Sequence, residues 1–133
     1  MTNDAPIPAA TVILLRDEPQ FEALMIARAE RSSFAGGALV FPGGRVDPGD
    51  GDPLWAEHAT GLSRDPVIAA AQVAAVREAF EEAGVLLARG PGGALLDADE
   101  VAALGPWRAN VERDDALFLT LVRRHGLMLA ADL

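Results

Sequence analysis

The run from Asp65 to Val85 constrains the fold more than any other part of the sequence. Asp65 is a good N-cap, and Pro66 suits the first helical position, where its missing N–H has no cost. Gly84 can adopt the left-handed conformation that ends many helices. These signals predict a helix that begins at Pro66 and ends just before Gly84.

The predicted helix has an apolar face and an acidic face. At 100° per residue, Glu78, Glu81 and Glu82 fall together, opposite the apolar side chains. Like charges at these spacings destabilise a helix by about 0.2–0.5 kcal/mol for each pair, and the last turn also carries the negative end of the helix dipole. A divalent cation would offset both effects, because hard cations prefer oxygen ligands. We interpret the acidic face as a candidate metal site; a solvated surface is the alternative. The side chains predicted to pack are Ala69, Val73, Val76, Phe80 and Ala83.

A second motif, Phe-Pro-Gly-Gly, stands upstream at residues 41–44. Together with Arg-Glu-Ala-Phe-Glu-Glu-Ala-Gly-Val at 77–85, it resembles the Nudix box, G-x5-E-x7-R-E-U-x-E-E-x-G-U, in which U is a bulky aliphatic residue. Ala79 is smaller than the usual residue at its position. The residues that match the second half are Arg77, Glu78, Glu81, Glu82, Gly84 and Val85.

The first half of the box departs from the pattern. The box places 13 residues between its glycine and its arginine, whereas 32 separate Gly44 from Arg77, so 19 are extra. Counted forward from Gly44, Asp50 takes the place of the first glutamate; counted back from Arg77, Ala69 does. We favour Asp50, with box segments at 41–50 and 73–85 and a loop inserted at about 51–65. Loops of this length in a compact domain are usually functional or mobile.

Further residues narrow the resemblance to one branch of the superfamily. Arg28 and Arg31 precede the Phe-Pro-Gly-Gly motif, and Arg-Val-Asp-Pro-Gly-Asp follows it from Arg45. This arrangement is similar to the coenzyme A diphosphatases of peroxisomes and their bacterial relatives. The resemblance implies that Arg28, Arg31 and Arg45 bind substrate, because arginine can hold a diphosphate through two hydrogen bonds. Ordinary surface charge is the alternative on residue type alone.

The resemblance also implies catalytic roles. Glu78 is the first candidate for the general base, with Arg77 and Glu81 in the catalytic set and Arg77 orienting either Asp50 or Glu81. A base supplied from beyond Leu133 is the alternative. The glycines at 43–44 can adopt positive φ and allow close backbone approach. The implied ligands of Mg²⁺ or Mn²⁺ are Glu78, Glu81, Glu82 and the Gly44 carbonyl.

The resemblance implies an α/β fold, an α/β/α sandwich around a mixed sheet. Apolar runs predict strands at 8–16, 21–28, 38–41 and 85–88, of which the first is mostly buried and forms an antiparallel hairpin with the second. A helical turn is expected at 55–58. The segment at about 97–126 is predicted to be helical, with a capping box at Asp97, a helical turn containing Trp107, and Asp115 capping a helix that stops at Gly126.

We expect a single domain over residues 1–133 that is incomplete at its C-terminus. No strand is predicted after the last helix, whereas the family fold has later strands and a final helix. A piece of a longer protein is therefore the expected explanation. Sheet edges left open in this way would favour a homodimer.

Composition excludes several function classes. The net charge of −9 and pI near 4.5 do not favour long nucleic acid or an anionic membrane as partners. With no cysteine, the chain has no disulfides, zinc–thiolate sites or thiol catalysis. The N-terminus lacks the features of a signal peptide, and no apolar run approaches the ~18–20 residues that span a bilayer. We expect a cytoplasmic protein.

The expected function is metal-dependent hydrolysis of a nucleoside diphosphate linked to another group. Coenzyme A or an acyl-coenzyme A is the leading substrate, and ADP-ribose, dinucleotide polyphosphates and NADH are alternatives. The interrupted box leaves open a catalytically silent module that binds a nucleotide or a protein.

Overall fold

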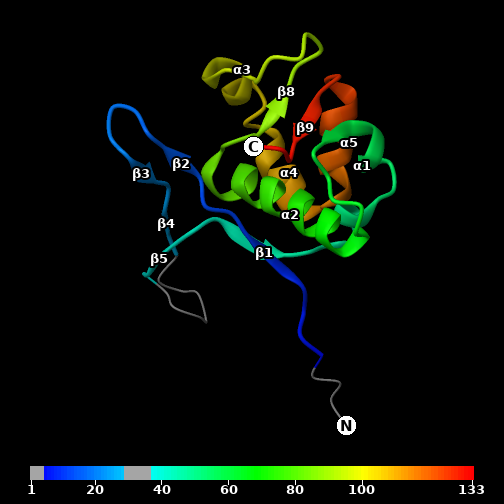
Figure 1. Cartoon of the computed structure of the whole chain (residues 1–133), viewed down its shortest axis with the longest axis horizontal. Helices are drawn as coiled ribbons and strands as arrows, with labels where there is room; N and C mark the ends of the chain where they lie inside the picture. Colours follow the sequence, from blue (N-terminus) through cyan, green and yellow to red (C-terminus); the bar gives the residue numbers. More distant parts are fainter. Residues whose placement is uncertain (1–4, 29–36) are drawn as a thin grey trace.

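The computed structural model of the protein describes residues 5–28 and 37–133 (Figure 1). In this part of the chain, helices are combined with strands of two or three residues, which is the α/β class that the sequence predicts. The helices are η1 (Pro48–Gly51), α1 (Trp55–His58), α2 (Pro66–Ala83), α3 (Ala98–Ala103), α4 (Trp107–Arg113) and α5 (Ala116–Arg124). The strands are β1 (Ala9–Thr11), β2 (Leu15–Arg16), β3 (Glu22–Ala23), β4 (Ile26–Ala27), β5 (Leu39–Val40), β6 (Gly43–Arg45), β7 (Ala59–Thr60), β8 (Ala88–Arg89) and β9 (Met128–Ala130).

Helix α2 begins and ends where the sequence predicts. The Asp65 side chain accepts a hydrogen bond of 2.9 Å from the Val67 N–H, and Pro66 occupies the first turn. Gly84 has a φ of 68°, and its N–H bonds back to the last turn. Local sequence therefore sets both ends of the helix. Among the described residues, neither α2 nor any other helix has the length and apolar character needed to cross a bilayer.

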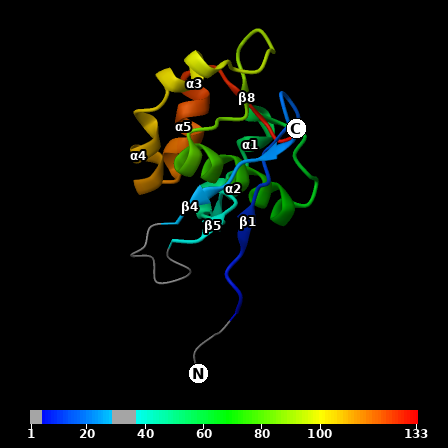
Figure 2. The same ribbon diagram turned by 90° about the vertical axis from the view of Figure 1, so that its left-hand side faces the viewer.

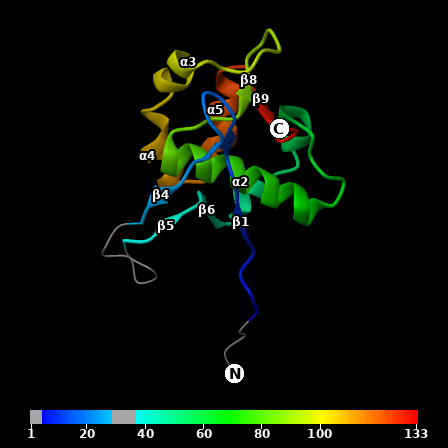
Figure 3. The same ribbon diagram turned by 60° about the vertical axis from the view of Figure 1, so that its left-hand side comes forward.

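Helix α2 lies between two layers of the structure. The antiparallel pair β1–β6 runs along one side, and α4 and α5 lie on the other (Figures 2 and 3). On the helical side, the Phe80 ring stacks on Phe118 of α5 with centroids 6.3 Å apart, and the Trp55 ring of α1 lies 5.5 Å from the same Phe118 ring. Each large apolar side chain that is fully buried contributes roughly 1.5–3 kcal/mol. This cluster fixes α1 and α5 against α2.

A small mixed sheet has β9 at its centre. Strand β7 pairs with β9 in parallel and β8 pairs with it antiparallel, so that Ala59 and Ala88 both face Leu129. One strand, β9, therefore follows the last helix, where the sequence predicts no later strand pair. Strand β9 has three residues, too few for the alternating pattern that identifies a strand in a sequence.

The N-terminal hairpin forms as predicted, but it is shorter and more exposed. Leu15 pairs with Ala23 in the antiparallel ribbon β2–β3. The predicted strand at 8–16 is divided into β1 and β2, and it is not mostly buried, since Ile13 and Leu15 expose 56% and 59% of their surface. The ribbon stands clear of the helices (Figure 1), so no described layer covers these side chains.

The glycine motif lies inside a strand. The strand predicted at 38–41 is limited to β5, and Gly43 and Gly44 belong to β6. Neither glycine has a positive φ, so that expectation is wrong. The expected close approach to the backbone is found at Gly44. A Cβ on Gly44 would overlap the Glu78 carboxylate. The strand predicted at 85–88 is likewise displaced, to β8.

The inserted and helical segments follow the prediction in outline. The turn expected at 55–58 is α1, and Asp97 forms the predicted capping box with Glu100, with bonds of 2.8 and 2.9 Å. The helical turn at Trp107 extends into the longer α4. Asp115 does not cap α5: the Ala116 N–H donates to Asp114 at 3.1 Å instead.

Candidate active site

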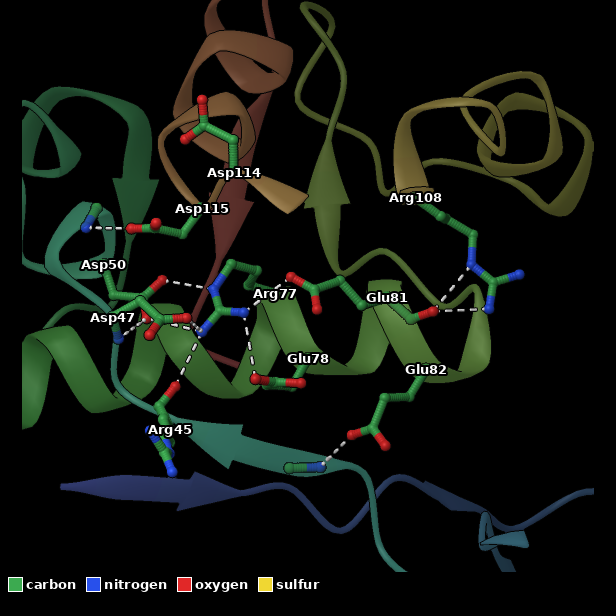
Figure 4. Close-up of polar contacts among 12 residues, drawn as sticks. Arg45, Asp47, Asp50, Arg77, Glu78, Glu81, Glu82, Arg108, Asp114 and Asp115 are labelled. Carbon is green, nitrogen blue, oxygen red and sulfur yellow. Dashed lines mark hydrogen bonds and ion pairs between the residues drawn. The ribbon is translucent and has the colours of Figure 1, made fainter. Parts of the chain in front are cut away.

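The site is built around the buried guanidinium of Arg77. Arg77 Nε and Nη2 donate to the two oxygens of Asp50 at 2.8 and 2.9 Å, and Nη2 also donates to the Arg45 carbonyl at 2.9 Å. Nη1 donates to Glu81 at 2.8 Å and to Glu78 at 3.2 Å (Figure 4). A buried charge is tolerated only when it is paired and hydrogen-bonded, and Arg77 meets this requirement. The network joins α2 to η1 and β6.

Helix η1 is held in place so that Asp50 faces Arg77. The Asp47 N–H donates to Asp50 at 2.8 Å. At Gly49, the N–H donates to Asp115 at 2.6 Å and the carbonyl accepts from Trp55 Nε1 at 2.9 Å. The first turn of α5 and the short helix α1 therefore both position Asp50.

Two of the three glutamates, Glu78 and Glu81, lie between α2 and its neighbours rather than on an open face. The Glu78 and Glu81 side chains expose only 12% and 9% of their surface. Glu78 lies against Gly44, where only a glycine leaves room for it. Glu82 is exposed and accepts a hydrogen bond of 2.9 Å from the Gly43 N–H. Two of the three carboxylates thus meet at Arg77, and the third lies on β6.

Burial changes the protonation of these groups. It raises the pKa of Glu78 to about 7, against the opposing charge of Arg77 and with help from Glu81 and Glu82. Burial also raises the pKa of Glu81, although the hydrogen bond from Arg77 lowers it. Burial lowers the pKa of Arg77, but its hydrogen bonds with Asp50 and Glu81 outweigh this and hold the pKa above its ordinary range. Burial therefore makes Glu78 and Glu81 easier to protonate than free glutamates.

Arg108 fixes the end of the acidic helix. Its Nε and Nη2 donate to the Glu81 carbonyl at 3.2 and 2.8 Å (Figure 4). These bonds satisfy a carbonyl in the last turn of α2, which has no partner within the helix. Motif reasoning missed Arg108 and Asp115, and also Asp47, whose carboxylate lies 3.3 Å from Arg77 Nη2. Each reaches the site through a tertiary contact that no local pattern reveals.

The three predicted substrate-binding arginines have different positions. The Arg45 side chain is exposed, while its carbonyl belongs to the Arg77 network. Arg28 is exposed at the end of β4, where its backbone N–H and carbonyl bond to Ala38 and Gly37. Arg31 lies outside the described residues.

The donor chemistry fits a hard divalent cation. Carboxylate and carbonyl oxygens are the ligands that Mg²⁺ and Mn²⁺ prefer, and Glu78, Glu81, Glu82 and the Gly44 carbonyl offer only such oxygens. The geometry is less complete. Within residues 5–28 and 37–133, no three His, Cys, Asp or Glu side chains are grouped closely enough to hold an ion.

Comparison with known proteins places this site in a family. A scan against models of protein families finds no match. The acyl-coenzyme A diphosphatase NUDT19 of Gallus gallus is 35% identical over 147 aligned positions, which cover 80% of this chain and 39% of the relative. The crystal structure of a Nudix hydrolase from Alicyclobacillus acidocaldarius superposes with a TM-score of 0.68 at 31% identity, covering 94% of this chain and 57% of the other.

These coverages mean that the chain spans about two fifths of the length of NUDT19 and less than two thirds of the Alicyclobacillus protein. The chain is similar to Nudix hydrolases, and it resembles their coenzyme A diphosphatase-like branch.

Proposed function

We propose that the chain hydrolyses the diphosphate of a nucleoside diphosphate linked to another group, with a divalent metal ion, and that coenzyme A or an acyl-coenzyme A is the substrate. The observation that carries the proposal is the buried Arg77 network, which holds Glu78 and Glu81 beside the glycine strand β6. The similarity to a relative named an acyl-coenzyme A diphosphatase supports the substrate class.

The metal ligands would be Glu78, Glu81, Glu82 and the Gly44 carbonyl, and the ion would be Mg²⁺ or Mn²⁺. Bound there, the ion would neutralise diphosphate oxygens and increase the acidity of a water molecule. The side chain of Glu82 is accessible, and its bond to the Gly43 N–H places it beside the same strand.

Glu78 is proposed as the general base. Water attacks one phosphorus atom, the bridging P–O bond breaks, and Glu78 takes the proton of the water. A pKa of about 7 suits a group that must accept a proton near neutral pH. Arg77 is a positioning residue, since its bonds to Glu78 and Glu81 fix both carboxylates. Arg45, Arg28 and Arg31 are proposed to contact substrate phosphates, because guanidinium groups match phosphate geometry.

The proposal is tested by separating the products formed from coenzyme A, octanoyl-coenzyme A, ADP-ribose and NADH, each with Mg²⁺, with Mn²⁺ or with chelator. Coenzyme A should give adenosine 3′,5′-bisphosphate and phosphopantetheine only when metal is present. Cleavage of only ADP-ribose or NADH would support the proposed reaction and contradict the proposal that coenzyme A is the substrate. Turnover that is unchanged in chelator would contradict the proposed dependence on a metal ion.

A catalytically silent nucleotide-binding module is the second candidate. It is favoured by the lack of any three grouped metal-binding side chains in the described part of the chain. This candidate predicts that coenzyme A raises the melting temperature while none of the four compounds is cleaved under any metal condition. Metal-dependent products would exclude it.

A further inference from the structure

A second cavity lies beside the first half of α2, away from the glutamates. Its volume is about 430 Å³, and it is partly open to solvent. One wall is the α2 face that carries Ala69, Ala70 and Val73, and the other is formed by residues 50–64. The inserted segment that interrupts the Nudix box therefore builds most of this pocket.

The lining of the pocket suits an uncharged apolar group. Trp55, Leu62 and the α2 side chains are apolar, and a pocket with few polar groups is typical of sites for organic ligands. The two lining carboxylates are already engaged: Asp50 binds Arg77, and Asp52 accepts the Leu54 N–H at 2.9 Å. Arg64 and Ser63 are the other polar side chains of the lining, so most of the wall is apolar.

The pocket adjoins the catalytic cluster. Asp50 lines the pocket and also bonds to Arg77, so it forms the wall between the two. Ala70 precedes Glu78 by eight residues on the same helix, which corresponds to about 12 Å along the axis. A flexible arm attached to a diphosphate at Glu78 can span this distance.

We infer that this pocket receives the acyl chain of an acyl-coenzyme A, so that the inserted segment determines substrate specificity. The inference rests on the proposed function, and it goes further by assigning a role to residues 51–64. The occupant is an uncharged hydrocarbon chain linked as a thioester to the pantetheine arm of the substrate.

The kinetic test fills the pocket without touching the glutamates. In A70L the larger side chain occupies space beside Gly51, whose added Cβ would be 4.0 Å from the Ala70 Cβ. We expect kcat/KM for octanoyl-coenzyme A to fall about tenfold or more relative to that for coenzyme A itself. The matched control is A103L, an exposed position on α3, which should leave the ratio of the two substrates unchanged. An unchanged ratio in A70L would overturn the inference, and so would an equal loss for both substrates.

A binding test needs neither metal nor turnover. Isothermal titration of the unmodified chain with S-octanoylpantetheine should give saturable binding. Pantetheine should bind to the unmodified chain at least tenfold more weakly, and so should S-octanoylpantetheine to the A70L variant. Absence of binding to the unmodified chain would overturn the pocket assignment, even if the enzyme cleaved coenzyme A. Binding without any hydrolysis would instead reject the proposed function and retain the pocket.

Discussion

Arg77 and Asp50 form a two-bond ion pair, with N···O distances of 2.8 and 2.9 Å, in which neither side chain exposes more than 2% of its surface. The two residues are 27 positions apart, one on α2 and the other on η1. Because both side chains are removed from water, loss of either one would leave an unpaired buried charge and destabilise the fold. The ion pair therefore links α2 to η1 beside Glu78 and Glu81, which bond to the same Arg77.

Replacing Asp50 with alanine should destabilise the chain by about 3–5 kcal/mol, because the Arg77 guanidinium would remain buried with two donors unpaired. Urea unfolding monitored by circular dichroism measures this loss. Asp52→Ala is the control, since Asp52 lies nearby but accepts only a local N–H, and it should change stability by about 1 kcal/mol or less. Equal effects of the two substitutions would contradict the role of the pair.

The stability of the metal-free chain should depend on Glu78 through pH. Its pKa is about 7 in the folded chain against 4.5 for the free group, so the folded state keeps a proton that the unfolded state has lost. The resulting penalty is absent below about pH 4.5, grows as pH rises towards 7 and is complete above that, by at most roughly 3 kcal/mol.

Melting temperatures in chelator between pH 5 and 8 test this dependence. Glu78→Gln should remove the part of the fall in melting temperature that Glu78 causes. The melting temperature of the variant should therefore rise relative to that of the unmodified chain as pH increases. Glu57→Gln, which is exposed on α1, controls for the loss of one negative charge. Parallel curves for Glu78→Gln and the unmodified chain would show that Glu78 is not perturbed.

Gly44 should tolerate no side chain. Gly44→Ala would place a methyl group where the Glu78 carboxylate lies, so we expect a loss of about 1–3 kcal/mol together with a large fall in kcat. Gly92→Ala is the matched control, because a Cβ there has no neighbour within 4 Å. A fully active Gly44→Ala variant would show that Glu78 need not lie against β6.

Asp115 should affect activity although it is remote from the glutamates. Its carboxylate holds the Gly49 N–H at 2.6 Å and so keeps η1 and Asp50 in place. Asp115→Ala should destabilise the chain by about 1–3 kcal/mol and lower kcat several-fold. In the neighbouring Asp114→Ala, the loss of the Ala116 cap should reduce stability while kcat stays the same. A similar kcat for the two variants would contradict this positioning role.

The sequence predicts those features that depend on local chemistry. Both ends of α2 follow from Asp65, Pro66 and Gly84, and the capping box at Asp97 follows from residues three positions apart. The family resemblance implies that Arg77 orients either Asp50 or Glu81, and in the structure Arg77 bonds to both.

Other features depend on tertiary packing and have no local signal. Asp115 was predicted to cap its own helix, but its carboxylate bonds to a loop 66 residues away, and Arg108 reaches α2 across 27 residues. Strands of two or three residues are too short to show a period, which explains why β9 was missed and why the edges of β5 and β8 were misplaced. The burial of Glu78 and Glu81 also required the position of η1, because a helix pattern alone places them on an open face.

The most direct test is the rate of coenzyme A cleavage by the unmodified chain, Glu82→Gln and the control Glu57→Gln, each with Mg²⁺ and with chelator. Glu82 lies on the acidic helix but outside the Arg77 network, so its loss should spare the fold. The account predicts metal-dependent cleavage that is abolished in Glu82→Gln and retained in Glu57→Gln, with both variants folded. Full activity in Glu82→Gln, or cleavage that survives chelator in the unmodified chain, would contradict it.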